Sequence, residues 1–251
     1  MAENKFPTEV IDLPSEGRLY PKDSPLSEGK IEIKYMTAKE EDILTSQNLI
    51  KKGLVIDKLL EALIVSEGVH IDDLITGDKN AIMVAARILA YGAEYTVELT
   101  NQYTDEKFNH TFNLTDCPFK ETPSDVDYSS GRLSVELPVS KANIEFKLLT
   151  GKEEKAISRE IQARKKVGAS SPEVTTRLKH TIISVNGDDS RQRINEFVDN
   201  ELLSKDSLYL RTKIQEYAPD IELSHEVDME GQMVKVDIPL TIEFFWPKTS
   251  G

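Results

Sequence analysis

The most constraining feature of the sequence is a segment that occurs twice. Residues 25–41 read PLSEGKIEIKYMTAKEE, and residues 138–154 read PVSKANIEFKLLTGKEE, 113 positions later and without a gap. Nine of the 17 aligned positions are identical, whereas unrelated segments of ordinary composition match at roughly one. So long a period lies outside the range of about 20–50 residues that is typical of solenoids. The sequence therefore predicts a duplicated domain or half-domain.

The similarity continues downstream with a changed offset. Residues 91–95 and 217–221 are related by 126 positions, as are residues 114–115 and 240–241. The difference between the two offsets places 13 extra residues in the second copy. The polar stretch 186–199 is the simplest position for them.

Each copy has the hydrophobic pattern of one strand, several helices and a closing hairpin. Alternating residues KIEIKY predict a strand at 30–35, and apolar residues at helical spacing follow it. The predicted helices are 55–65 and 78–91 in the first copy, and 172–184, 190–203 and 204–217 in the second. We therefore predict an α+β fold made of a tandem duplication of a strand–helices–β-hairpin unit. The predicted division is an extended N-terminal arm (1–28), a first repeat (29–118), a linker (119–136), a second repeat (137–247) and a tail (248–251).

The repeated Lys-Glu-Glu triplet has two interpretations. Thr37 lies three residues before Glu40, and Thr150 lies three residues before Glu153, which is the spacing of a capping box at the start of a helix. Retention of adjacent carboxylates also suggests a paired-carboxylate site. Helix capping is favoured, because acidic residues in a first helical turn offset the helix dipole.

Two apolar segments are candidate protein interfaces. The arm LPSEGRLYP contains the candidates Leu13, Pro14, Leu19, Tyr20 and Pro21. Its prolines and glycine interrupt any periodic element, so it is predicted to be extended. It either packs on its own domain or exposes these side chains to a neighbouring subunit.

The second apolar segment closes the last hairpin. Phe244, Phe245 and Trp246 are consecutive and hold a large share of the aromatic residues. They are expected either to seal a core or to anchor an interface.

Composition and missing motifs exclude several classes of function. The net charge of −13 argues against a nucleic acid partner, since phosphate binding needs clustered lysines and arginines. No apolar run approaches the ~20 residues of a membrane span, and the N-terminus lacks the pattern of a secretory signal. Cys117 is the single cysteine, the four histidines are scattered, and no phosphate loop or nucleophile motif is present. We therefore expect no cofactor, no metal site and no small-molecule substrate.

Several segments resemble one family of phage proteins. LPSEGRLYP, KIEIKYMTAKEEDIL, VIDKLLEALI, GDKNAIMVAARILAYG and YTVEL closely resemble the baseplate hub assembly proteins of T4-like contractile-tailed bacteriophages. The resemblance covers residues 13–100 best and supplies no catalytic residues. It implies a non-enzymatic role in building the central hub of the tail baseplate, in the host cytoplasm during assembly, and leaves open whether the protein then stays in the virion tail baseplate or acts as a chaperone. The partners that it implies are other baseplate, hub or tape-measure proteins.

Three hypotheses follow. The first is a structural adaptor that docks baseplate proteins through both copies and the arm, so that removal of residues 1–24 is expected to spare the fold and abolish assembly. The second is a transient chaperone for the hub or tape-measure protein, absent from the mature virion. The third is an enzyme with its site between the copies, which nothing in the sequence favours.

Overall fold

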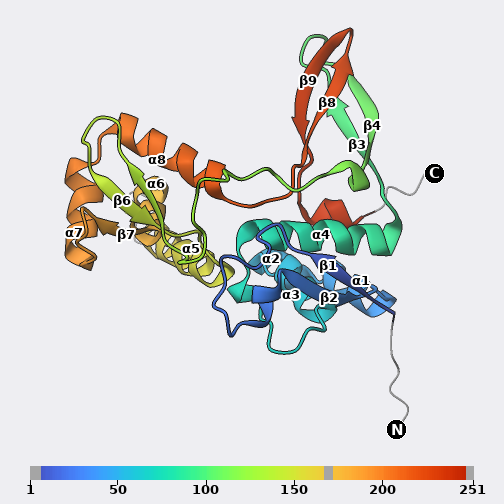
Figure 1. Cartoon of the computed structure of the whole chain (residues 1–251). Coiled ribbons are helices and arrows are strands. Elements are labelled where there is room, and N and C mark those ends of the chain that lie inside the picture. Colours follow the sequence, from blue (N-terminus) through green and yellow to red (C-terminus); the bar gives the residue numbers. More distant parts are fainter. Residues whose placement is uncertain (1–6, 167–171, 247–251) are drawn as a thin grey trace.

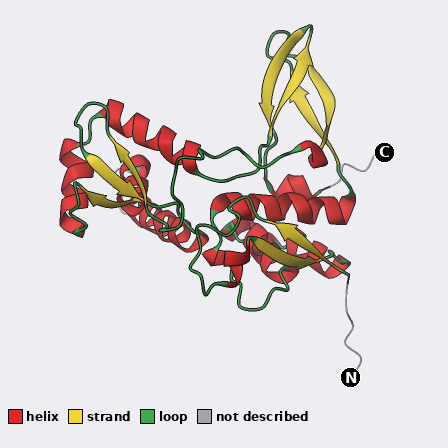
Figure 2. Ribbon diagram, in the orientation of Figure 1, coloured by secondary structure: helices red, strands yellow, loops and turns green. Residues whose placement is uncertain are grey.

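The computed structural model describes residues 7–166 and 172–246. Helices and antiparallel strand pairs follow one another along the chain in an α+β fold (Figure 2). Most buried apolar side chains fall into two clusters, which we call the first core and the second core. The first core draws on residues 13–117 and again on residues 221–245. The second core draws on residues 128–210. Segments near both ends of the described chain therefore share the first core.

The first core is built around a hairpin and a set of helices. Strand β1 (Thr8–Asp12) pairs antiparallel with β2 (Lys30–Lys34). The elements that follow are α1 (Ala38–Thr45), α2 (Gln47–Lys52), α3 (Val55–Leu63), α4 (Thr76–Tyr91), β3 (Glu94–Thr100) and β4 (Lys107–Asn113). Short 3-10 turns lie at Pro25–Glu28, Ile71–Asp73 and Leu114–Asp116. The alternation predicted for β2 is confirmed, because Ile31 and Ile33 point inward and are fully buried.

The second core is built around a three-stranded antiparallel sheet in the order β5-β6-β7. Its strands are β5 (Leu133–Glu136), β6 (Asn143–Phe146) and β7 (Ile182–Val185). Its helices are α5 (Gly151–Lys166), α6 (Glu173–Thr181), α7 (Arg191–Glu196), the π-helical turn Phe197–Glu201 and α8 (Ser204–Tyr217). A hairpin of β8 (Ser224–Met229) and β9 (Gln232–Asp237) and the 3-10 turn η5 (Ile242–Phe245) complete the chain.

Helix α4 lies between the β1–β2 layer and the C-terminal segments (Figure 1). Its residues are apolar on nearly all sides, and Ile82, Met83 and Val84 are buried. The helix ends at Tyr91, followed by Gly92 in a backbone conformation with φ of 85°. Glycine is favoured where φ is positive.

The C-terminal residues return to the first core rather than closing the second. Val227 and Met229 of β8, and Phe244 and Phe245 of η5, are buried there. The hairpins β3–β4 and β8–β9 lie side by side (Figure 1), and the Phe112 and His225 rings are 5.3 Å apart. Residues 221–245, assigned to the second repeat on the sequence, therefore pack with the first.

The predicted linker contacts both cores. Tyr128 is buried in the second core, and its hydroxyl donates to the Tyr217 carbonyl at the end of α8 (2.9 Å). Phe119 forms an isolated bridge with Ile221. The last four residues of the predicted linker form strand β5.

Three strands differ from the sequence-based expectation. Strand β1 lies in the segment predicted as an extended arm, and β5 lies in the linker, because each is stabilised only by pairing with a distant strand. The helix predicted for 172–184 ends at Thr181, where Ile182–Val185 begins β7. β-branched residues fit a pleated, half-buried surface, and here they complete the sheet beside β6.

The arm packs on its own chain, which was one of the two alternatives. Leu13 is 1% exposed in the first core, whereas Leu19 packs against the second. Gly17 adopts φ of 76°, and a Cβ on it would come within 2.2 Å of the Ser27 carbonyl oxygen. The expectation that residues 1–24 can be removed without loss of the fold is therefore corrected, because they supply β1 and part of the first core.

We predict that Leu13→Ala lowers the free energy of unfolding by about 2–5 kcal/mol, since it leaves a cavity in the first core. Val10→Ala in the neighbouring strand is the matched control, because Val10 is 59% exposed and such surface changes stay within about 0.5 kcal/mol. Denaturant unfolding monitored by circular dichroism measures both. Equal stability of the two variants would show that the arm does not contribute to the core.

Candidate functional site

Asp78, the third residue of α4, holds the arm. Its carboxylate accepts from the Ser15 backbone N–H (2.9 Å) and hydroxyl (2.7 Å), and from the Tyr20 hydroxyl (2.5 Å). Tyr20 also accepts from the Ile75 backbone N–H (3.1 Å). Ser15 and Asp78 are fully buried. The loop between β1 and β2 is thus fixed to the start of the long helix.

We call the elements packed around the first core the first unit and those packed around the second core the second unit. Asp206, the third residue of α8, makes a similar contact in the second unit. Its carboxylate accepts from the backbone N–H groups of Val139 and Ser140, both at 2.9 Å. These residues lie in the loop between β5 and β6, and the Asp206 side chain is fully buried. In each case, an aspartate at the third position of a long helix therefore holds the loop of a strand pair.

Burial affects the pKa values of the two aspartates differently. For Asp78, burial raises the pKa of the carboxyl and outweighs the hydrogen bonds from Ser15 and Tyr20, while the nearby charge of Asp220 raises it further. For Asp206, burial also acts to raise the pKa, but the backbone hydrogen bonds from Ser140 and Val139 outweigh it and the pKa lies below its usual value. Backbone N–H groups stabilise the ionised form of a carboxyl group. The negative charge is therefore stabilised more at Asp206 than at Asp78.

The predicted caps of α1 and α5 have the same geometry. The Glu40 carboxylate accepts from the Thr37 backbone N–H (2.9 Å) and hydroxyl (2.6 Å), and from Lys34 Nζ (2.9 Å). Burial opposes its ionisation, but the bonds from Lys34 and Thr37 prevail and lower the pKa of Glu40 to about 2.

In the second unit, the Glu153 carboxylate accepts from the Thr150 backbone N–H (2.9 Å) and hydroxyl (3.2 Å) and pairs with Lys147. The carboxylates that follow have other partners: Glu41 accepts from the Tyr91 hydroxyl, and Glu154 binds Arg177. The adjacent glutamates are thus engaged separately, in capping and in tertiary contacts.

The two units meet along a seam at the start of α4. A Cβ on Gly77 would lie 1.9 Å from the Pro219 carbonyl oxygen, so the α8–β8 connection contacts the helix backbone directly. The Gly151 N–H donates to the Leu74 carbonyl (2.9 Å). The Lys155 ammonium lies 2.9 Å from the Asp57 carboxylate.

The C-terminal aromatic residues have two environments. Phe244 and Phe245 are fully buried in the first core, and the Phe244 ring lies 4.9 Å from that of Tyr95 in an edge-on contact. The buried Arg87 Nε donates to the Phe244 carbonyl (3.0 Å). Trp246 is 40% exposed and is the member of this group that faces solvent.

The candidate interface residues of the arm are also divided. Leu13 and Pro14 are buried, Leu19 and Tyr20 are half-buried, and Pro21 is exposed. In the described conformation, therefore, Pro21 and Trp246 are the accessible candidates.

An open groove lies between α6 and α8, and its lining also includes residues 75–77 at the start of α4 and the connection 218–220. It has a volume of about 590 Å³, with Leu178 in its wall and Val174 and Leu208 at its rim. Val174 is 46% exposed and Leu208 is 58% exposed. Sequence analysis missed this groove, because it depends on how two helices separated by more than 20 residues are packed.

Metal-ion sites and membrane-spanning helices are two further features relevant to function. Among residues 7–166 and 172–246, no group of three or more His, Cys, Asp or Glu side chains is placed to hold a metal ion. No helix in this part of the chain is long and apolar enough to cross a membrane.

Comparison with known proteins identifies the family. The sequence model of the family described as T4 bacteriophage base plate protein matches residues 8–245. The chain belongs to this family. No curated protein and no solved structure matches the chain significantly.

Membership of the T4 bacteriophage base plate protein family gives this protein a structural setting among other phage baseplate proteins. The match includes both cores and the segments that connect them. Asp78, Asp206 and Arg87 each hold a separate chain segment in place.

The two buried aspartates of this baseplate protein are expected to respond differently to replacement by asparagine. Asp206→Asn leaves one backbone N–H facing the side-chain NH2 group, which cannot accept, and lowers the free energy of unfolding by about 1–3 kcal/mol at pH 7. Asp78→Asn is expected to cost less, because two of the three Asp78 donors are hydroxyl groups that can turn to accept from the amide.

The pH dependence distinguishes the two sites. The lowered pKa of Asp206 means that its contribution is present above its unfolded pKa of about 4 and is lost as the pH falls through its folded value. The penalty of Asp206→Asn should therefore shrink on acidification. The pKa of Asp78 is shifted in the opposite direction, so the contribution of Asp78 to the free energy of unfolding is lost as the pH rises. Unfolding titrations from pH 3 to 8 measure both, and an Asp78→Asn penalty as large as that of Asp206→Asn at pH 7 would contradict the assignment.

Proposed function

We propose that this protein is a non-enzymatic structural adaptor of the contractile-tail baseplate, acting in hub assembly through two related units. The observation that supports this most strongly is that each unit has its own core and equivalent elements, while a packed seam joins them. A chain of this kind presents two related surfaces in a fixed relation. Duplication within one chain is one way to fill two quasi-equivalent positions in a symmetric assembly.

The element order supports the proposed duplication. Each sequence copy contains a strand pair, a capped helix, a helix that runs into the edge of that strand pair, a long helix and a hairpin, although the hairpin of the second copy packs in the first core. Ile33 bridges Ile64 in the first unit, and its counterpart Phe146 pairs with Ile182 in the second. The capping pairs and the buried aspartates Asp78 and Asp206 occupy corresponding positions.

The hub assignment rests on the resemblance of residues 13–100 to hub assembly proteins, and the proposed partners are other baseplate, hub or tape-measure proteins. The arm has a different role from the one first expected. Its Leu13 joins the first core and its Leu19 contacts the second, so we propose that it fixes the two units to one another. Docking then falls to exposed surfaces such as that around Trp246.

The alternative is a transient chaperone for the hub or tape-measure protein. The groove between α6 and α8 favours it, because an apolar groove suits the temporary burial of a partner's apolar helix. Both functions begin in the host cytoplasm, but only the adaptor remains in the virion tail.

Quantitative mass spectrometry of purified virions separates the two functions. The adaptor predicts a fixed copy number relative to the other baseplate proteins. Absence from virions, with presence in baseplate intermediates from infected cells, would instead establish the chaperone.

A second prediction concerns Trp246. Phage carrying Trp246→Ala should form fewer complete baseplates, while the isolated protein keeps its free energy of unfolding within about 0.5 kcal/mol. Tyr103→Ala is the matched control, because Tyr103 is an aromatic residue that is 51% exposed in the turn between β3 and β4. Normal baseplates, counted by electron microscopy of lysates, would exclude Trp246 as an interface residue.

A further inference from the structure

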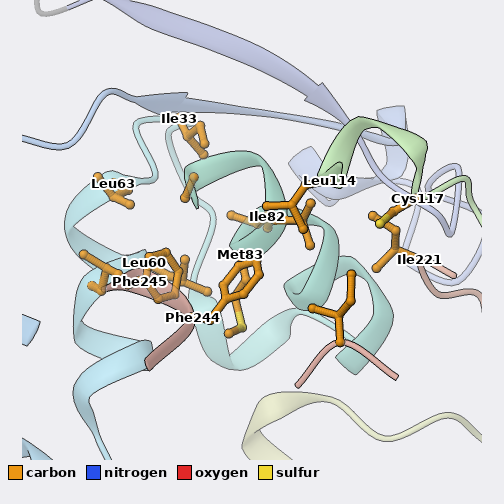
Figure 3. Close-up of a cluster of buried hydrophobic side chains, with 14 of the residues drawn as sticks. Ile33, Leu60, Leu63, Ile82, Met83, Leu114, Cys117, Ile221, Phe244 and Phe245 are labelled. Atoms are coloured by element: carbon orange, nitrogen blue, oxygen red, sulfur yellow. The ribbon is translucent and has the colours of Figure 1, made fainter. Parts of the chain in front are cut away.

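In the first unit, helices α3 and α4 are covered by the C-terminal turn η5. Figure 3 shows the Phe244 and Phe245 rings among Leu60 of α3 and Met83 of α4, with which they share the first core. Arg87 of α4 donates to the Phe244 carbonyl. Leu60, Met83 and Arg87 thus mark the part of the first unit that receives two adjacent aromatic side chains.

The corresponding part of the second unit can be located from two fixed points. On α3 and α6, Leu60 precedes the bridging residue Ile64 by four positions, as Leu178 precedes Ile182. On α4 and α8, Met83 and Arg87 follow the buried Asp78 by five and nine positions. Counting the same steps from Asp206 gives Arg211 and Gln215. This register aligns the starts of the two helices and is two residues later than the 126-position offset at their ends, because α8 has 14 residues and α4 has 16.

These three counterparts, Leu178, Arg211 and Gln215, all line the open groove between α6 and α8. The groove is therefore the second unit's equivalent of the place that η5 fills in the first. No described residue fills it, and its rim residues Val174 and Leu208 are exposed.

We propose that the α6–α8 groove binds a short segment of a partner protein that carries two adjacent aromatic side chains. The occupant's chemistry is taken from the chain itself, because TIEFF is what covers the equivalent helices of the first unit. The groove binds the aromatic pair, and the Gln215 amide lies where Arg87 donates to the peptide carbonyl. That the partner is a baseplate protein rests on the proposed adaptor function.

The charge of the groove adds a second requirement. Arg211 replaces the apolar Met83 in the wall, and its Nε donates to the Ser207 carbonyl of its own helix (3.3 Å). The lining also carries the carboxylates Glu154, Glu173 and Asp220, of which Glu154 binds Arg177. A partner carboxylate is therefore complementary only where it lies beside Arg211. The chain's own segment has a carboxylate next to its aromatic pair, with Glu243 directly before Phe244.

The test uses a fluorescein-labelled peptide of residues 239–246, PLTIEFFW, titrated with the full-length protein and followed by anisotropy. We expect saturable binding, at least tenfold weaker for the protein variants Val174→Glu and Leu208→Glu. Leu203→Glu is the matched control, because Leu203 is 49% exposed just before α8 but does not line the groove. A peptide with both phenylalanines replaced by serine should not bind.

Several outcomes would overturn the proposal. The first is a lack of saturable binding up to about 1 mM peptide, and the second is equal binding of the peptide by the Leu208→Glu and Leu203→Glu variants. Sedimentation that shows a dimer, converted to a monomer by Leu208→Glu, would make a second copy the occupant. Peptide binding that requires deletion of residues 167–171 would make that segment the occupant. Because the measurement uses purified protein and a synthetic peptide, its failure is separate from that of the adaptor function, which virion mass spectrometry tests.

Discussion

Burial of Phe244 and Phe245 against α3 and α4 is the contact on which the arrangement of the chain depends. It returns the last described residues to the core that the first ones build, so the second unit is held between two segments of the first. Full burial of two aromatic side chains removes on the order of 150–250 Å² each from water. The buried Arg87 adds a directional contact, because its Nε donates to the Phe244 carbonyl.

A second constraint operates inside each unit. A buried aspartate at the third position of the long helix holds the loop of the strand pair, through hydroxyl groups and one N–H at Asp78 and through two N–H groups at Asp206. The same position thus performs the same task with different electrostatics. Where the donors are backbone groups, the charge is stabilised, and where they are largely hydroxyl groups, burial dominates the pKa.

Local patterns allowed much of the structure to be predicted. The strand at Lys30–Lys34, the helix Ser204–Tyr217 and the buried helix ending at Tyr91 follow from periodicity and end signals that lie within each segment. The strands β1 and β7 could not be predicted in this way, because their stability comes from pairing with residues far along the chain. The groove between α6 and α8 was missed for the same reason, since no property of either helix alone specifies the space between them.

The sequence by itself determined the α+β class, the repeated segment and the family resemblance, because these depend on residue identity and short-range order. Only the tertiary structure decided which residues are accessible. It buried Leu13, Phe244 and Phe245 and left Pro21 and Trp246 exposed, because an apolar side chain is equally suited to a core and to an interface. It also assigned the last hairpin to the first core and left the groove between α6 and α8 open, since packing depends on which distant surfaces meet.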